Sequence, residues 1–172
     1  MPGDERSADA PTGDHVGDRH RGDPLGTPRR RLLVVAALGL LPWTVILVGG
    51  ELTLVFPFGF FNTNPPELVD IYTFLFVAGG RLPRNPQLLP LSILFYLGAL
   101  GSAAAGLVDR EDPRLTAGLL VLAGVAHLGV AYSVSHRIRY TPVPFGALGM
   151  LAVAWWYYWP SLRATVMAPV RD

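Results

Sequence analysis

LLPLSILFYLGALGSAAAGLV at residues 88–108 and PRLTAGLLVLAGVAHLGVAYSV at residues 113–134 are the two runs that decide how this chain folds. Each is almost free of charge, and the four residues Asp109-Arg110-Glu111-Asp112 separate them. At 1.5 Å per residue, a helix of either length reaches about 30 Å, which is the hydrocarbon thickness of a bilayer. Asp112 and Pro113 supply an N-cap and a first helical residue for the second run. We therefore expect two adjacent antiparallel membrane-spanning helices.

Two further apolar stretches flank this pair. Residues 32–50 contain no charge and follow Arg29-Arg30-Arg31, which predicts a first span of about 28 Å with a kink at Pro42. Residues 143–159 form a shorter run that ends in a Trp- and Tyr-rich cluster suited to the level of lipid headgroups. The expected fold is therefore all-α, a four-helix transmembrane bundle with spans at about 32–50, 88–108, 113–134 and 143–159.

The first stretch also permits an export signal. A twin-arginine signal could begin at residues 29–33, and a signal peptidase could cut near Gly49-Gly50. The apolar run is longer than the core of a signal peptide and no Ala-x-Ala site follows it, so the sequence favours a span. The arginines then mark the cytoplasmic flank.

The connection at residues 51–87 is the longest between the expected spans. Asn64-Pro65-Pro66-Glu67 has the pattern of a helix start and Gly79-Gly80 that of a stop. The enclosed stretch of about 14 residues is too short to cross a bilayer and carries Glu67 and Asp70. We expect a short interfacial helix at about 65–78 in an outer loop.

Charge and composition restrict the remaining segments. Residues 1–28 are rich in Gly, Asp, Pro and Arg and predict a disordered cytoplasmic tail, and residues 164–172 form a C-terminal tail. The arginines near the spans favour both termini in the cytoplasm of a multi-pass cell-membrane protein. The net charge of +1 argues against nucleic-acid binding, and the absence of cysteine excludes disulfides and thiolate metal sites.

His127 and Glu51 are the candidate functional residues. Ionisable side chains are nearly absent from the interior of the expected spans, and His127 is the exception. An ionisable group within a membrane is a functional hypothesis. A single hydrogen bond to a neighbouring helix would also account for it, and this structural interpretation is favoured. Glu51 shares its loop with Glu67 and Asp70, where solvated carboxylates are more common than catalytic ones. The residues predict no catalytic, cofactor-binding or metal site.

Small residues mark one face of the second expected span. They lie three or four residues apart, a spacing that lets helix backbones approach closely, whereas Ala103 lies nearer the opposite face. The expected helix-packing residues are Gly98, Gly101, Ser102 and Ala105.

Several stretches together resemble a small haloarchaeal membrane-protein family of unknown function. They are Arg30-Arg31-Leu32-Leu33 leading to Leu41-Pro42-Trp43, Leu54 to Gly59, Thr116 to Gly124, and Ala154 to Pro160. The resemblance covers about residues 29–163. It implies a multi-pass protein in an archaeal cell membrane and brings no catalytic residues.

Two functions from different classes remain open. The first is a non-enzymatic accessory or structural protein that packs with itself or with a partner protein in the lipid bilayer. The second is a small oligomeric transporter or channel with His127 lining the path. The chain has none of the common nucleotide-binding, hydrolase or metalloprotease motifs, so an enzyme has no support in the sequence and no cofactor is expected.

Overall fold

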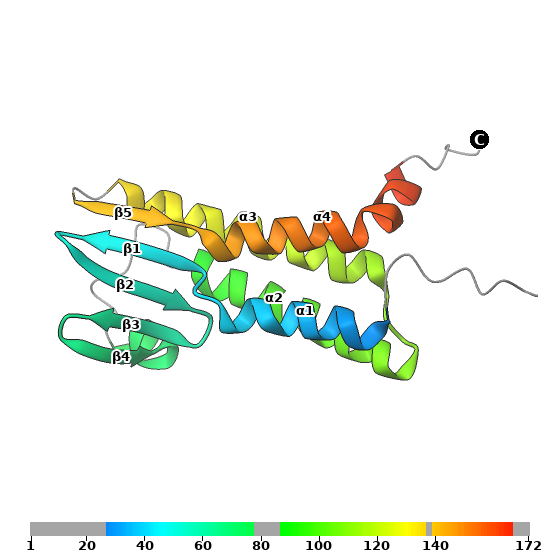
Figure 1. Ribbon diagram of the computed structural model, residues 1–172, viewed down its shortest axis with the longest axis horizontal. Coiled ribbons are helices and arrows are strands. Elements are labelled where there is room, and N and C mark those ends of the chain that lie inside the picture. The colour runs from blue at the N-terminus through cyan, green and yellow to red at the C-terminus, as the bar shows by residue number, and fades with distance from the viewer. Residues whose placement is uncertain (1–26, 78–86, 137–138, 167–172) are drawn as a thin grey trace, which may run out of the picture.

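A computed structural model describes residues 27–77, 87–136 and 139–166 of the chain, with side chains up to Trp159. This part contains four α-helices and a five-stranded antiparallel sheet (Figure 1). The fold is therefore mixed α/β, and the prediction of an all-α four-helix transmembrane bundle is wrong.

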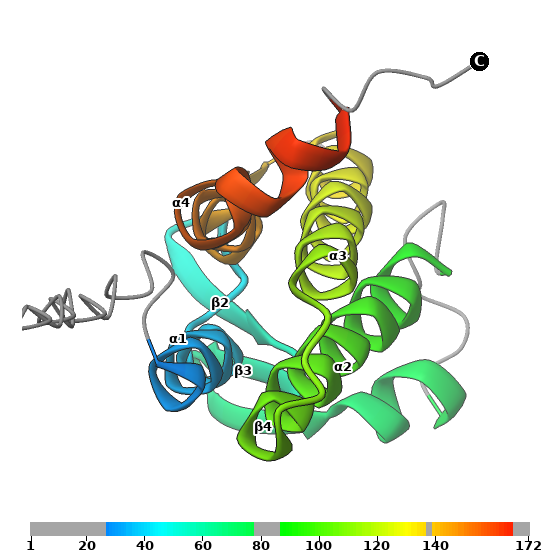
Figure 2. The same cartoon turned by 90° about the vertical axis from the view of Figure 1, so that its right-hand side faces the viewer.

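The helices lie side by side at one end of the molecule. They are α1 (Pro28–Leu40), α2 (Leu88–Ala105), α3 (Pro113–Ser135) and α4 (Phe145–Val166). A 3₁₀ turn, η2 (Gly106–Val108), extends α2. α2 and α3 form the central hairpin, and Figure 2 shows α1 and α4 lying on one side of it. The Asp112 carboxylate caps α3 by accepting from the backbone N–H groups of Arg114 and Leu115, at 2.9 and 3.4 Å, so the expected helix start is confirmed.

The sheet lies at the other end of the molecule. Its strands are β1 (Thr44–Val48), β2 (Glu51–Phe56), β3 (Gly59–Thr63), β4 (Pro66–Asp70) and β5 (Tyr140–Val143). Strands β1 to β4 pair in succession as hairpins, and β5 pairs with the free edge of β1, so the order is β4-β3-β2-β1-β5.

The predicted span at residues 32–50 is wrong because the helix stops at Leu40. Pro42 cannot donate a helical hydrogen bond, and the next five residues that form β1 include four β-branched ones, Thr, Val, Ile and Val. Gly49 and Gly50 have φ angles of 58° and 97°, which suits a two-residue hairpin loop. α1 is about 20 Å long and too short to cross a bilayer by itself.

The predicted interfacial helix at 65–78 is also wrong. Residues 66–70 pair with β3 as strand β4, and a single π-helical turn, η1 (Thr73–Val77), follows it. The Asp70 carboxylate accepts hydrogen bonds from the backbone and side chain of Thr73, at 2.9 and 2.6 Å. These bonds lower the pKa of Asp70 and end the strand in a turn. Gly79-Gly80, the expected helix stop, lies outside the described residues.

The sheet joins the helices at Trp43, between α1 and β1. Its backbone N–H donates to the Val55 carbonyl at 2.7 Å, and its carbonyl accepts from Gly146 N–H at 2.9 Å. A Cβ atom at Gly146 would lie 2.5 Å from the Trp43 Cα, so this approach requires glycine. The start of α4 is thereby held directly against the first strand.

Candidate functional site

His127 is at the centre of a buried polar cluster where the helices meet the sheet. Its side chain is fully buried in α3. The ring Nε2 lies 2.8 Å from the hydroxyl of Thr44 at the start of β1, and Nδ1 lies 3.3 Å from the hydroxyl of Ser92 in α2. Both hydroxyls are also buried. The imidazole therefore links three elements that are far apart in the sequence.

Aromatic rings enclose this cluster. The Trp43 ring packs edge-on against His127 and against Tyr96, with centroids 5.1 Å apart in both pairs. The Trp43 Nε1–H donates to the Leu38 carbonyl and the Tyr96 hydroxyl donates to the Val35 carbonyl, each at 2.9 Å. The Leu38 carbonyl lies in the last turn of α1, where intrahelical donors run out, and the Val35 carbonyl lies one turn earlier. Trp43 therefore satisfies a carbonyl at the end of α1 and also packs against the imidazole, and Tyr96 packs behind it.

An imidazole between two hydroxyls resembles the pairing of a base with a nucleophile. In this cluster, however, Ser92 and His127 are 0% exposed and Thr44 is 2% exposed. Each polar atom already has a partner, and no buried side-chain N or O among the described residues lacks a hydrogen bond. The arrangement suits a structural polar link, because a substrate could reach it only if the helices separated.

A second polar cluster lies at the opposite end of the helices. Arg31 of α1 and Glu111 of the α2–α3 link form an ion pair at 3.1 Å, with side chains 7% and 6% exposed. The Tyr158 hydroxyl of α4 donates to the other Glu111 oxygen at 3.0 Å. Beside them, the hydroxyls of Ser102 and Thr116 lie 2.7 Å apart and join α2 to α3. Glu111 thus connects α1 and α4 to the α2–α3 link at this end of the molecule.

The structure does not bring the two candidate functional residues together. Glu51 is exposed at the start of β2 and accepts from the Asn64 side chain at 3.1 Å, whereas His127 is buried in α3. Glu67 and Asp70 lie on the far edge strand β4. Among the described residues, no three His, Asp or Glu side chains come close enough to hold a metal ion.

The four small residues of α2 have different surroundings. A Cβ atom at Gly98 would lie 3.2 Å from the Leu119 side chain of α3, whereas one at Gly101 would meet nothing within 4 Å. Ser102 is partly buried by its hydrogen bond to Thr116, and Ala105 is partly buried. Ala103, expected near the opposite face, is 0% exposed. The fully packed face of α2 therefore runs through Tyr96, Ala99 and Ala103.

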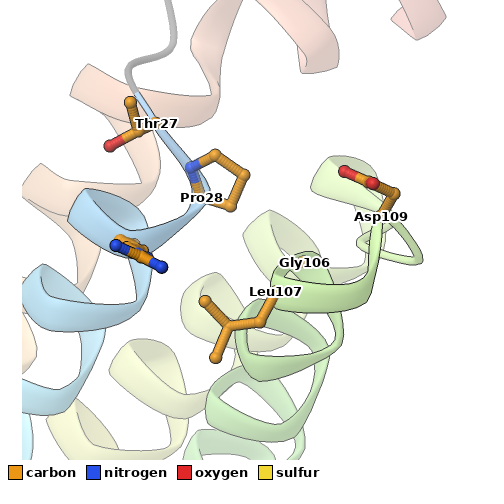
Figure 3. A pocket seen from close by; sticks show the side chains of 6 residues that line it. Thr27, Pro28, Gly106, Leu107 and Asp109 are labelled. Atoms are coloured by element: carbon orange, nitrogen blue, oxygen red, sulfur yellow. The ribbon is translucent and has the colours of Figure 1, made fainter.

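A shallow hollow lies between the start of α1 and η2. It is lined by Thr27, Pro28, Arg29, Gly106, Leu107 and Asp109. Figure 3 shows Thr27 and Pro28 on one wall and Leu107 and Asp109 on the other. Arg29 and Asp109 place opposite charges at its rim, both exposed. The hollow is open, and its polar groups are spread around it without converging on one point.

The sequence singled out His127 but missed its partners. Thr44 and Ser92 are ordinary residues in their local contexts, 83 and 35 positions away from it. In the sequence, Arg31 and Glu111 have the pattern of charges that flank membrane spans. One signal was available: Gly49-Gly50 between two β-branched runs is the pattern of a hairpin and would have pointed to the strand that carries Thr44.

The fold and the buried clusters define a mixed α/β protein, in which an apolar helical half and a five-stranded sheet are held together by internal polar contacts. The chain belongs to the family described as "Domain of unknown function (DUF8050)", whose model matches residues 12–168. No curated protein and no solved structure matches this chain.

Proposed function

We propose that this protein is embedded in a lipid bilayer through the α2–α3 hairpin and serves as a non-enzymatic accessory or structural protein there. The observation that carries the proposal is the exposure of its most apolar helix. The segment Leu88–Val108 has a mean hydropathy of 1.9 over 18 residues, of which 28% are buried inside the protein. The core helix of a soluble protein would bury most of such a surface.

The exposed side chains of α2 and α3 are large and apolar. On α2, Leu94 is 64% exposed and Leu97 53%, and on α3, Leu122 is 49% and Val125 55% exposed. Monomeric soluble proteins rarely expose contiguous apolar surfaces of this kind. These are the two described helices that are long and apolar enough to cross a membrane, and α3 has a mean hydropathy of 1.8.

Charges and aromatic residues favour the same interpretation. No Asp, Glu, Lys or Arg occurs in residues 32–40, 88–108, 115–135 or 145–159, so the charges of the helical half gather at its ends. Trp155, Trp156 and Trp159 are exposed near the end that holds Arg31 and Glu111. Tryptophan is enriched where lipid tails meet headgroups.

Orientation follows from the arginines. Arg29, Arg30, Arg110 and Arg114 lie at the end away from the sheet, and Arg139 lies on the sheet side. The positive-inside rule then supports a cytoplasmic N-terminus and α2–α3 link, an outer sheet and a cytoplasmic C-terminus. An archaeal cell membrane is part of the same proposal, with α1 and α4 running beside the α2–α3 hairpin between the two sides.

An accessory role fits the chemistry of the interior better than transport or catalysis. A transport path along His127 would need polar groups open to water, whereas both ring nitrogens are bonded to buried hydroxyls. The buried polar side chains of the described residues all bond to other groups of the protein. Binding to other molecules would then use the outer surfaces. Packing against lipid and a membrane partner is the use that those surfaces support.

Thiol labelling tests the membrane assignment sharply because the chain has no cysteine. Leu94→Cys and Glu67→Cys both place the thiol at an exposed position of the folded protein. In native membranes we expect a water-soluble maleimide to label Glu67→Cys fast and Leu94→Cys at least tenfold more slowly, with both labelled alike in SDS. Equal rates in membranes, or release of the wild-type chain by alkaline carbonate, would contradict the proposal.

A further inference from the structure

One face of the sheet carries apolar residues on all five strands. The strand register places Val143, Val45, Leu54, Phe61 and Leu68 in one continuous cross-strand row. Two residues after Val45 on β1, Leu47 pairs with Leu52 of β2 on the same face. We call this surface, defined by these seven residues, the outer sheet face. Among the strand-paired positions of this face, the charged residue is Asp70, which lies at a corner of the sheet, at the end of edge strand β4.

The opposite face is covered by the protein itself. Thr44 and Val55 point to that side and are 2% and 3% exposed, and Thr44 bonds to His127 of α3. Phe60, on the same face, packs on Phe74 of η1 with ring centroids 4.1 Å apart. Figure 2 shows α3 and α2 on this side of the sheet.

Nothing among the described residues covers the outer sheet face, and no helix crosses in front of it in Figure 1. Leu68 is 62% exposed, Leu47 42% and Leu52 39%. The inner members of the row, Val143, Val45, Leu54 and Phe61, are partly buried. An antiparallel sheet with one face on the core normally turns polar residues outward, so an apolar outer face indicates a partner.

The rest of this chain is poorly suited to be that partner. Residues 1–26 are the longest stretch outside the described part, and their large apolar residues are Met1, Val16 and Leu25. Lipid is also unsuitable, because β4 and β5 are edge strands whose unpaired backbone groups cannot enter hydrocarbon. The occupant must therefore be a protein surface that is apolar and flat.

We infer that the outer sheet face packs against the same face of a second copy, related by a two-fold axis. Two sheets stacked about 10 Å apart would bury both rows in one layer, as in a β-sandwich. A two-fold contact is self-complementary, and a face that is almost free of charge has little like-charge repulsion to overcome. This inference deepens the proposed function and rests on it, because it names the membrane partner.

The sheet face supplies about half of the area of a standard interface, and the helices beside it can supply the rest. Five strands of about five residues make a face of about 24 by 17 Å, or about 400 Å² for each copy. A standard interface needs about 800 Å² from each partner. α1 and α4 lie on this side of the molecule (Figures 1 and 2) and have exposed apolar side chains, among them Leu33 and Leu148, which can supply the remainder.

Cross-linking in native membranes tests the contact. Leu54→Cys places a thiol in the middle of the row, and Thr53→Cys places one on the opposite face of the same strand. With a bismaleimide of about 10 Å, matching the spacing of stacked sheets, we expect most of the Leu54→Cys chains to appear as dimers and at least fivefold fewer of the Thr53→Cys chains. Equal yields, or no dimer from Leu54→Cys, would overturn the inference.

A charge substitution separates loss of the dimer from loss of folding. Phe61→Arg buries two arginines in each dimer and should weaken self-association about 100-fold. Glu67→Arg changes charge at an exposed position of the other face and should leave self-association unchanged. Circular dichroism of both variants should match the wild type. A Phe61→Arg protein that remains as dimeric as Glu67→Arg in mild detergent would overturn the proposal.

The outcome is separable from that of the membrane assignment. A wild-type chain that is monomeric yet resists carbonate extraction would overturn the second copy while leaving the membrane proposal standing. A nitroxide at position 54 that is relaxed by oxygen in the lipid, with no dipolar coupling to a second label, would assign the face to lipid instead and would also overturn the dimer.

Discussion

Replacement of His127 by alanine should destabilise the protein strongly, by an amount that can be worked out from its contacts. The change removes the bonds to Thr44 and Ser92 and leaves two buried hydroxyls to find other partners, at a cost of about 1 kcal/mol each. The lost ring volume adds a cavity cost of about 1.5 kcal/mol, and loss of the edge-on contact with Trp43 about 0.5 kcal/mol. The expected loss is about 4 kcal/mol.

His127→Gln should recover about half of this loss, because glutamine keeps one donor and one acceptor on a side chain of similar length. Leu122→Ala, on the exposed side of the same helix, is the matched control and should cost less than about 1 kcal/mol in detergent. Thermal or denaturant unfolding of the four proteins in one detergent measures these differences.

Two results would refute the reasoning. One is a His127→Ala protein within about 0.5 kcal/mol of the wild type, the range of ordinary surface substitutions. The other is a wild-type melting temperature that shifts strongly between pH 5 and 8 while both His127 variants stay flat. The second result would make proton exchange at His127, and hence transport, the better interpretation.

Three further predictions concern the helix contacts and the orientation of the chain. Glu111→Gln breaks a buried ion pair and should cost about 3 kcal/mol of unfolding free energy, whereas Tyr158→Phe should cost about 1 kcal/mol, and equal costs would contradict this assignment. Ala103→Leu should lower the melting temperature far more than Gly101→Leu, because Ala103 is fully buried and Gly101 faces open space, and the reverse order would exclude this packing. Thr12→Cys should resist an impermeant thiol reagent in intact cells and react once they are opened, and labelling in intact cells would reverse the proposed orientation.

Helix starts and ends in the central hairpin could be predicted from sequence. The N-cap at Asp112 depends on residues within one turn of it, and the helix that follows runs through an apolar stretch with no breaker. The same local reasoning failed at residues 32–50. An uncharged apolar run is compatible with a helix or with buried strands, and its length alone does not decide between them.

Of the residues in the buried cluster, the sequence predicts His127 but not its partners Thr44 and Ser92. His127 was conspicuous because it is an ionisable group in an apolar run, and its burial follows from the small residues around it. Thr44 could not be assigned to it, because the position of β1 depends on pairing with β2 and β5. The burial of Ala103 differs from the expected face, because the position of the neighbouring helix decides which side of α2 is buried.

The sequence by itself determined where the charges stop and the apolar helices begin, because capping, proline and helix length act within a few residues. It also determined that residues 88–108 form an apolar run without charge. The tertiary structure alone decided that residues 44–70 pair as strands and that the imidazole meets Thr44, 83 positions away. It also decided that one sheet face stays uncovered. Strands are stabilised by partners distant in the chain, so their pairing and the side they bury are properties of the whole fold.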